Sequence, residues 1–151
     1  MTRVDFYHLQ KGNIEGALPK LLEKAYGTGK KILVKIGNEE RVEFLNTYLW
    51  TYDEQSFLPH GTKKDGNANM QPIWLTSQDD NPNDASILFL VDGAQINADS
   101  AASFERILNI FDGNNQEALS WSREFWKQLK SQDMECFYWQ QDDNGAWHQK
   151  A

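Results

Sequence analysis

Three basic side chains and a tryptophan recur at helical spacing in SWSREFWKQLK, residues 120–130. At about 100° per residue, Lys127 falls about 40° and Lys130 about 340° from Arg123, so the cations form one narrow stripe. Trp126 borders this stripe at about 300°. Such a border suits a ligand that is both acidic and apolar, because the cations can bind its carboxylates and the ring can cover its apolar part. The same stripe is also typical of a solvent-exposed helix face near a C-terminus.

The opposite side of this predicted helix is apolar. Ala118, Trp121, Phe125 and Leu129 spread from roughly 160° to 240°, which predicts the face that packs on the core. Leu119, at about 320°, lies beside the basic stripe.

No pattern in the chain indicates a metal site, a cofactor site or catalysis. The three histidines, His8, His60 and His148, do not pair at helical spacing, and Cys136 adds no metal-ligand pattern. The segment YGTGKK has the wrong glycine spacing for a phosphate-binding loop and lies between a helix and a strand, so it indicates a helix C-terminus. We therefore expect no catalytic residue, no metal and no cofactor.

Composition predicts one globular domain, residues 1–151, with 40% hydrophobic residues. The 22 acidic and 15 basic residues give a net charge of -7, which argues against broad attraction to nucleic acid. The chain has one cysteine, and it lacks a signal-peptide pattern and an apolar run of the roughly 20 residues needed to span a bilayer. We expect a cytoplasmic location.

Strands and helices alternate along the sequence. Strands are predicted at 3–9, 31–36, 72–76, 86–91 and 136–141. Helices are predicted from Asn13 or Pro19 to Gly27, at 38–50, at 101–111 with Asp99 or Ser100 as the cap, and at 116–132. Asn144-Gly145 is a possible turn near the end. This order predicts an α/β fold with three layers, a largely parallel sheet and helices on both faces.

Several segments occur in an order that resembles a known protein family. They include FYHL, AYGTGKKILVKI, LWTYDEQSFLPHG, PIWLT, FERILNIFD and SREFWKQLK. Together they resemble the chi subunit of bacterial DNA polymerase III over roughly residues 3–137.

The resemblance implies a nucleotide-binding-like topology without a nucleotide site and without a catalytic role. It implies a replication adaptor that binds the acidic, Phe-terminated tail of single-stranded DNA-binding protein and joins the clamp loader through the psi subunit. The expected tail-binding residues are Arg123, Trp126, Lys127, Lys130 and Trp50, and those expected at the psi side are Phe57 and Pro59. Leu119 stands where some members carry a lysine, which predicts a weaker basic pocket.

Two other functions remain as alternatives. A small nucleotide-binding α/β enzyme would need a phosphate loop and metal-binding carboxylates at strand ends. A protein that binds single-stranded DNA directly would use the aromatic residues and the basic stripe, and the net charge of -7 opposes this function.

Overall fold

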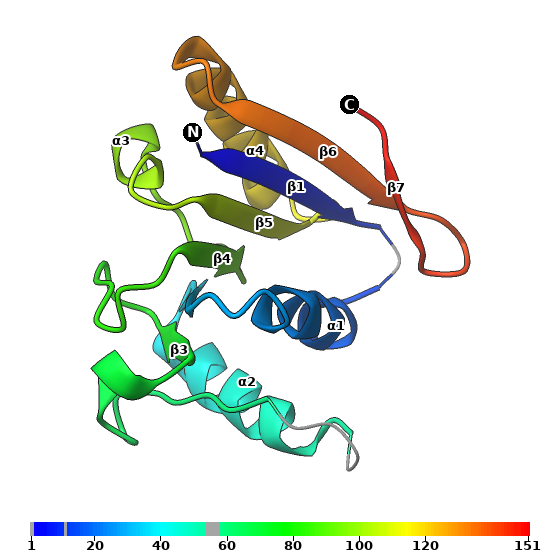
Figure 1. Ribbon diagram of the computed structural model, residues 1–151. Helices are drawn as coiled ribbons and strands as arrows, with labels where there is room; N and C mark the ends of the chain where they lie inside the picture. Colours follow the sequence, from blue (N-terminus) through cyan, green and yellow to red (C-terminus); the bar gives the residue numbers. More distant parts are fainter. Residues whose placement is uncertain (1, 11, 54–57) are drawn as a thin grey trace.

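The computed structural model describes residues 2–10, 12–53 and 58–151 (Figure 1). Its elements, in chain order, are β1 (Arg3–Leu9), α1 (Ile14–Tyr26), β2 (Ile32–Ile36), α2 (Glu39–Thr51), the 3-10 helix η1 (Ala68–Met70), β3 (Ile73–Thr76), β4 (Ile87–Val91), α3 (Ala98–Ala101), β5 (Arg106–Asp112), α4 (Gln116–Ser131), β6 (Glu135–Gln141) and β7 (Trp147–Gln149).

The strands form one sheet in the order β3-β2-β4-β5-β1-β6-β7. Neighbouring strands are parallel except for β7, which pairs antiparallel with β6. Helices α1 and α2 bury their apolar residues on one face of the sheet, and α3 and α4 bury theirs on the other. The predicted three-layer α/β fold with a largely parallel sheet is confirmed.

Helix α1 begins at the earlier of its two predicted starts. The Asn13 side chain accepts a hydrogen bond from the Gly16 amide, so Asn13 is the N-cap and Pro19 lies inside the helix. Pro19 cannot donate a backbone hydrogen bond, but its ring is buried with the apolar side of the helix. The helix ends at Gly27, which confirms that YGTGKK is a helix C-terminus.

The prediction of a helix over 101–111 is wrong. The chain forms the single turn α3, capped by Asn97, and then strand β5. Strand β5 lies between β4 and β1, so alternate residues pack into opposite halves of the core: Ile107 and Phe111 on the α4 side, Leu108 and Ile110 on the α1 side. A strand that is buried on both faces has a continuous apolar run, which periodicity alone cannot distinguish from a buried helix.

The end of the chain folds back as a hairpin. Gly145 has φ 84° and its amide donates to the Asp142 carbonyl, which confirms the predicted turn. Strand β7 then covers the outer edge of β6. Among the described residues, no helix combines the length and apolarity needed to cross a membrane.

Candidate functional site

Helix α4 has the two faces that its sequence predicts. The Asn115 side chain caps it by accepting from the Ala118 amide. Phe125 and Leu129 are buried against the sheet, and Ala118 and Trp121 are partly buried beside them. The basic stripe therefore points away from the core, where Arg123, Lys127 and Lys130 are exposed.

A groove of about 470 Å³ runs beside this stripe. Its rim on α4 includes Arg123, Trp126 and Lys127. Its remaining lining comes from α4, the sheet and the chain end: Phe6, His8, Phe111, Leu119, Ser122, Tyr138 and Ala151. The groove combines an aromatic interior with two cations, so it can hold an apolar side chain and an anion at the same time.

The sheet side of the groove follows from strand register. Phe6 and His8 are two residues apart on β1, so they point to the same face. In the parallel pairing, Tyr138 of β6 stands beside Phe6 and Phe111 of β5 stands beside His8. Three strands that are distant in sequence thus place four rings under α4, and Trp126 packs edge-on against Phe6 with 5.2 Å between ring centroids.

His8 is held rigidly within this aromatic set. Its Nδ1 lies 2.6 Å from the Tyr138 hydroxyl, and its ring stacks on Phe111 with centroids 5.0 Å apart. The Tyr138 oxygen also accepts a hydrogen bond from Gln140 Nε2. Burial lowers the pKa of His8, as does the nearby charge of Arg123, while Asp112 opposes them.

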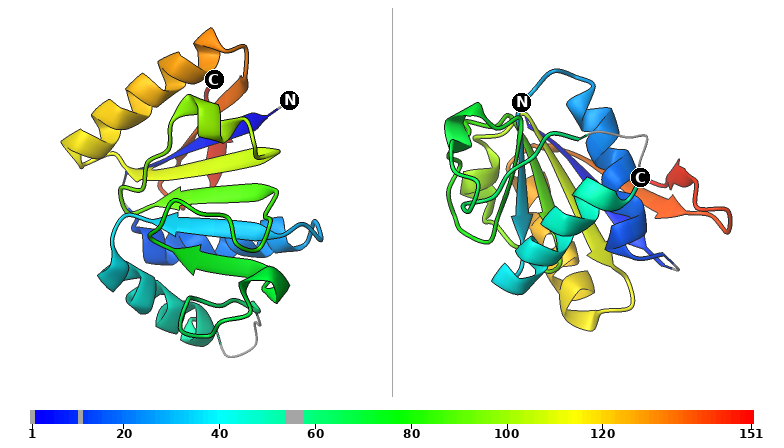
Figure 2. Two further views of the ribbon diagram at one scale, coloured as in Figure 1. Left: turned by 90° about the vertical axis from the view of Figure 1, so that its left-hand side faces the viewer. Right: turned by 90° about the horizontal axis from the view of Figure 1, so that it is seen from below.

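The structure brings together some of the predicted site residues and separates others. Arg123, Trp126 and Lys127 share the groove, and Lys130 lies one turn further along, with its Nζ 5.7 Å from the centre of the Trp126 ring. Trp50 lies away from the groove, so the expectation that it lies close to the other tail-binding residues is wrong. It lies in the last turn of α2, which packs against the other face and the other end of the sheet (Figure 2).

Trp50 belongs to a second exposed region. It is 47% exposed and stacks on the buried His60 ring, with centroids 4.0 Å apart. The partly buried Pro59 precedes His60, so it lies on the same side of the molecule. Phe57 lies outside the described residues.

The strand residues of the groove are functional candidates that the sequence did not reveal. Phe6, His8, Phe111 and Tyr138 look like ordinary core residues in their own segments. Because Phe6 and His8 are two residues apart in a predicted strand, the sequence indicates that they share one face of the sheet. Which face that is depends on the packing of α4.

Comparisons with known proteins identify the family. A family model described as DNA polymerase III chi subunit, HolC, matches residues 1–136. The chain belongs to the DNA polymerase III chi subunit family. It is 31% identical over 158 aligned positions to the probable DNA polymerase III subunit chi of Rickettsia prowazekii (strain Madrid E), and the alignment covers 100% of this chain and 93% of that protein.

Membership of the chi family supports a role in DNA replication as an accessory subunit of DNA polymerase III, associated with its clamp loader. The groove beside α4 and the region around Trp50 lie within the matched residues, apart from the groove's contacts with Tyr138 and Ala151.

Proposed function

We propose that this chi-family chain is a non-catalytic adaptor. In this proposal the groove beside α4 binds the acidic, Phe-terminated C-terminal tail of single-stranded DNA-binding protein. The observation that carries it is the combination of an aromatic interior with Arg123 and Lys127 on the rim.

The chemistry of such a tail matches both parts of the groove. The terminal phenyl ring fits the interior lined by Phe6, Phe111 and Trp126, where it is removed from water. The terminal carboxylate and the acidic side chains before it meet Arg123 and Lys127, and Lys130 extends the cationic surface along α4. The overall charge of -7 disfavours binding to nucleic acid. A groove that is basic only locally therefore selects the acidic peptide tail over the DNA to which single-stranded DNA-binding protein is bound.

A second contact, with the psi subunit, fits the region around Trp50. A large, half-exposed aromatic ring that stacks on His60, the residue after Pro59, is suited to anchor a partner. We assign Trp50 to this contact rather than to the tail, together with Pro59 and with Phe57 of the adjoining segment. The two contacts lie on opposite faces of the sheet, so both partners can bind at once, as a bridge between clamp loader and coated template requires.

Peptide binding tests the groove. We would titrate the full chain into a labelled acidic peptide that ends in Pro-Phe with a free carboxylate and follow fluorescence anisotropy. We expect a micromolar Kd that rises with salt, because the rim cations are exposed. The same peptide with an amidated C-terminus should bind more weakly.

Charge reversal locates the site. Lys127→Glu should weaken binding by about tenfold or more, whereas Lys20→Glu, an equal charge change at an exposed position of α1 on the other face, should not. Unchanged affinity in a folded Lys127→Glu variant would remove the groove from the proposal. A Trp50→Ala variant should keep tail affinity and lose affinity for psi.

A further inference from the structure

The groove beside α4 contains an ionisable side chain that the proposed contacts with the tail leave unused. His8 lines the groove together with Arg123, Lys127 and Tyr138, and it is only partly buried, so a ligand in the groove lies against its ring. Histidine is the side chain whose charge ordinarily changes between pH 5 and pH 8. The lining side chains therefore carry two positive charges, on Arg123 and Lys127, when His8 is neutral and three when it is protonated.

The surroundings of His8 hold its ring in place in either protonation state. The ring stacks on Phe111 with centroids 5.0 Å apart, and Gly113 lies against its Nε2 edge, where an added Cβ would be 1.7 Å away. Its Nδ1 lies 2.6 Å from the Tyr138 hydroxyl. This hydroxyl can donate to Nδ1 of the neutral ring or accept from Nδ1–H of the charged ring, and its oxygen has a second lone pair for the bond from Gln140. Protonation therefore adds a charge to the groove and leaves the ring where it is.

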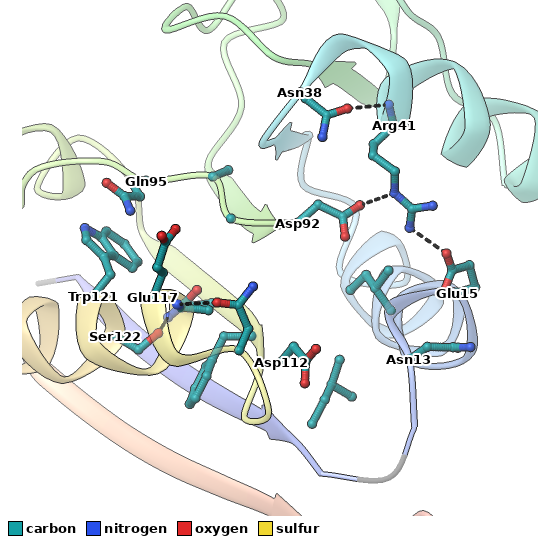
Figure 3. Close-up of a pocket in the computed structure, with 18 of the residues that line it drawn as sticks. Asn13, Glu15, Asn38, Arg41, Asp92, Gln95, Asp112, Glu117, Trp121 and Ser122 are labelled. Atoms are coloured by element: carbon teal, nitrogen blue, oxygen red, sulfur yellow. Dashed lines mark hydrogen bonds and ion pairs between the residues drawn. The ribbon is translucent and has the colours of Figure 1, made fainter.

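The charged groups around His8 come from α4 and β5. Burial lowers the pKa of His8 most, and Arg123 of α4 lowers it further. Lys127, one turn along the same helix, adds a second cation to the rim, and Tyr138 of β6 contributes its hydrogen bond. Asp112 of β5 raises the pKa, but it lines a second cavity, of about 440 Å³, on the other side of α4 from the groove (Figure 3). Among the described side chains, two cations and one carboxylate thus act on His8, so its protonated form is short of an anion.

We propose that His8 is a third anion-binding residue of the groove, and that its protonation strengthens binding of the acidic tail. This inference rests on the proposed function of the groove. A carboxylate of the tail beside Arg123 and His8 attracts both charges and offsets the repulsion between them. The tail also displaces water from the ring, but the ring is already partly buried, so the attraction outweighs this loss. Protonation and tail binding therefore favour each other.

Tail affinity as a function of pH tests this inference. The labelled peptide that ends in Pro-Phe would be titrated by fluorescence anisotropy at pH 7.5 and pH 5.5, at one ionic strength. Its carboxyl groups have ordinary pKa values of about 3.5–4.3 and stay ionised over this range. For the wild type we expect the Kd to fall about threefold or more on going to pH 5.5. For His8→Gln, which keeps a polar side chain and cannot gain a charge, the two Kd values should agree within about 1.5-fold.

A matched variant and a direct measurement complete the test. His148→Gln, the same substitution at an exposed position of β7 outside the groove lining, should keep the pH dependence of the wild type. Nuclear magnetic resonance of the His8 ring nitrogens in the wild type, from pH 5 to pH 8, requires no variant to fold. The midpoint of their titration should move to higher pH when the peptide is saturating. An unmoved or lowered midpoint, or equal wild-type Kd values at the two pH values, would overturn the proposal.

The same data separate this inference from the proposed function. If the peptide binds equally well at both pH values and the His8 midpoint stays in place, the groove remains the tail site and only the role of His8 is refuted. If no binding is detected at either pH, the proposed function itself fails, and this inference fails with it. A pH dependence that disappears in His148→Gln and persists in His8→Gln also refutes the role of His8.

Discussion

Gly113 is the position where one methyl group should disturb the groove most. A Cβ at this residue would lie 1.7 Å from His8 Nε2, far inside van der Waals contact. The imidazole cannot simply turn aside, because it stacks on Phe111 and is hydrogen-bonded to Tyr138. Gly113→Ala therefore forces a choice between moving the loop after β5 and displacing His8.

The expected loss of stability follows from what His8 gives up. The hydrogen bond to Tyr138 contributes about 1 kcal/mol. The stack on Phe111 contributes about 0.5–1.5 kcal/mol. Residual overpacking costs about 1–3 kcal/mol. These effects overlap, so we expect Gly113→Ala to lower the free energy of unfolding by about 2–4 kcal/mol, a fall in Tm of roughly 5–15 °C.

A double-mutant cycle shows whether His8 is the cause. Urea unfolding would be measured for the wild type, Gly113→Ala, His8→Ala and the double variant. In the His8→Ala background, Gly113→Ala should change the free energy of unfolding by less than about 0.5 kcal/mol. The coupling energy between the two positions should then be about 2–3 kcal/mol. If the glycine substitution costs the same with and without the imidazole, the contact with His8 is not what requires glycine here.

Three further predictions concern charge and buried polar groups. Burial lowers the pKa of His8 below its usual 6.5, so the stability that neutral His8 contributes above that pH is lost as the pH falls. The free energy of unfolding in urea should therefore decrease less between pH 7.5 and pH 5.5 for His8→Gln than for the wild type. The pKa of Glu15 is lowered although burial alone would raise it, because Arg41 donates to its carboxylate. In Arg41→Gln a ¹³C titration of Glu15 should therefore move to higher pH, and an unmoved midpoint would contradict the ion pair. Asn83, fully buried, donates to two backbone carbonyls, so Asn83→Ala should cost about 2–4 kcal/mol; a calorimetric loss under about 0.5 kcal/mol would show that the loop re-forms these bonds.

The sequence predicted the features that depend on one segment at a time. The start of α2 at residue 38, the end of α1 at Gly27 and the two faces of α4 are all in the structure, and the start of α1 is the earlier of the two that the sequence left open. Each depends on side chains within a turn or two of one another. Helical spacing alone was therefore enough to place the basic stripe beside Trp126.

Tertiary structure decided the features that depend on distant segments. The segment of β5 fits a helix as well as a strand, and its position between β4 and β1, buried on both faces, settles which one forms. Trp50 and α4 belong to the same family pattern, but the sheet holds them apart because α2 and α4 pack against opposite faces.

The groove beside α4, and a cavity on the other side of that helix, show the same distinction between local and tertiary features. Strand register sets Phe6 and His8 beside Tyr138 and Phe111, although more than 100 residues separate the two ends of the chain that meet there. That cavity is lined by carboxylates from the starts of α1 and α4, the loop after β4 and the end of β5, and each of them is an ordinary helix-start or turn residue in its own segment. By itself, the sequence determined which α4 side chains share a face. Folding decided which strands lie under that face, because contacts between distant segments depend on the packing of the whole sheet.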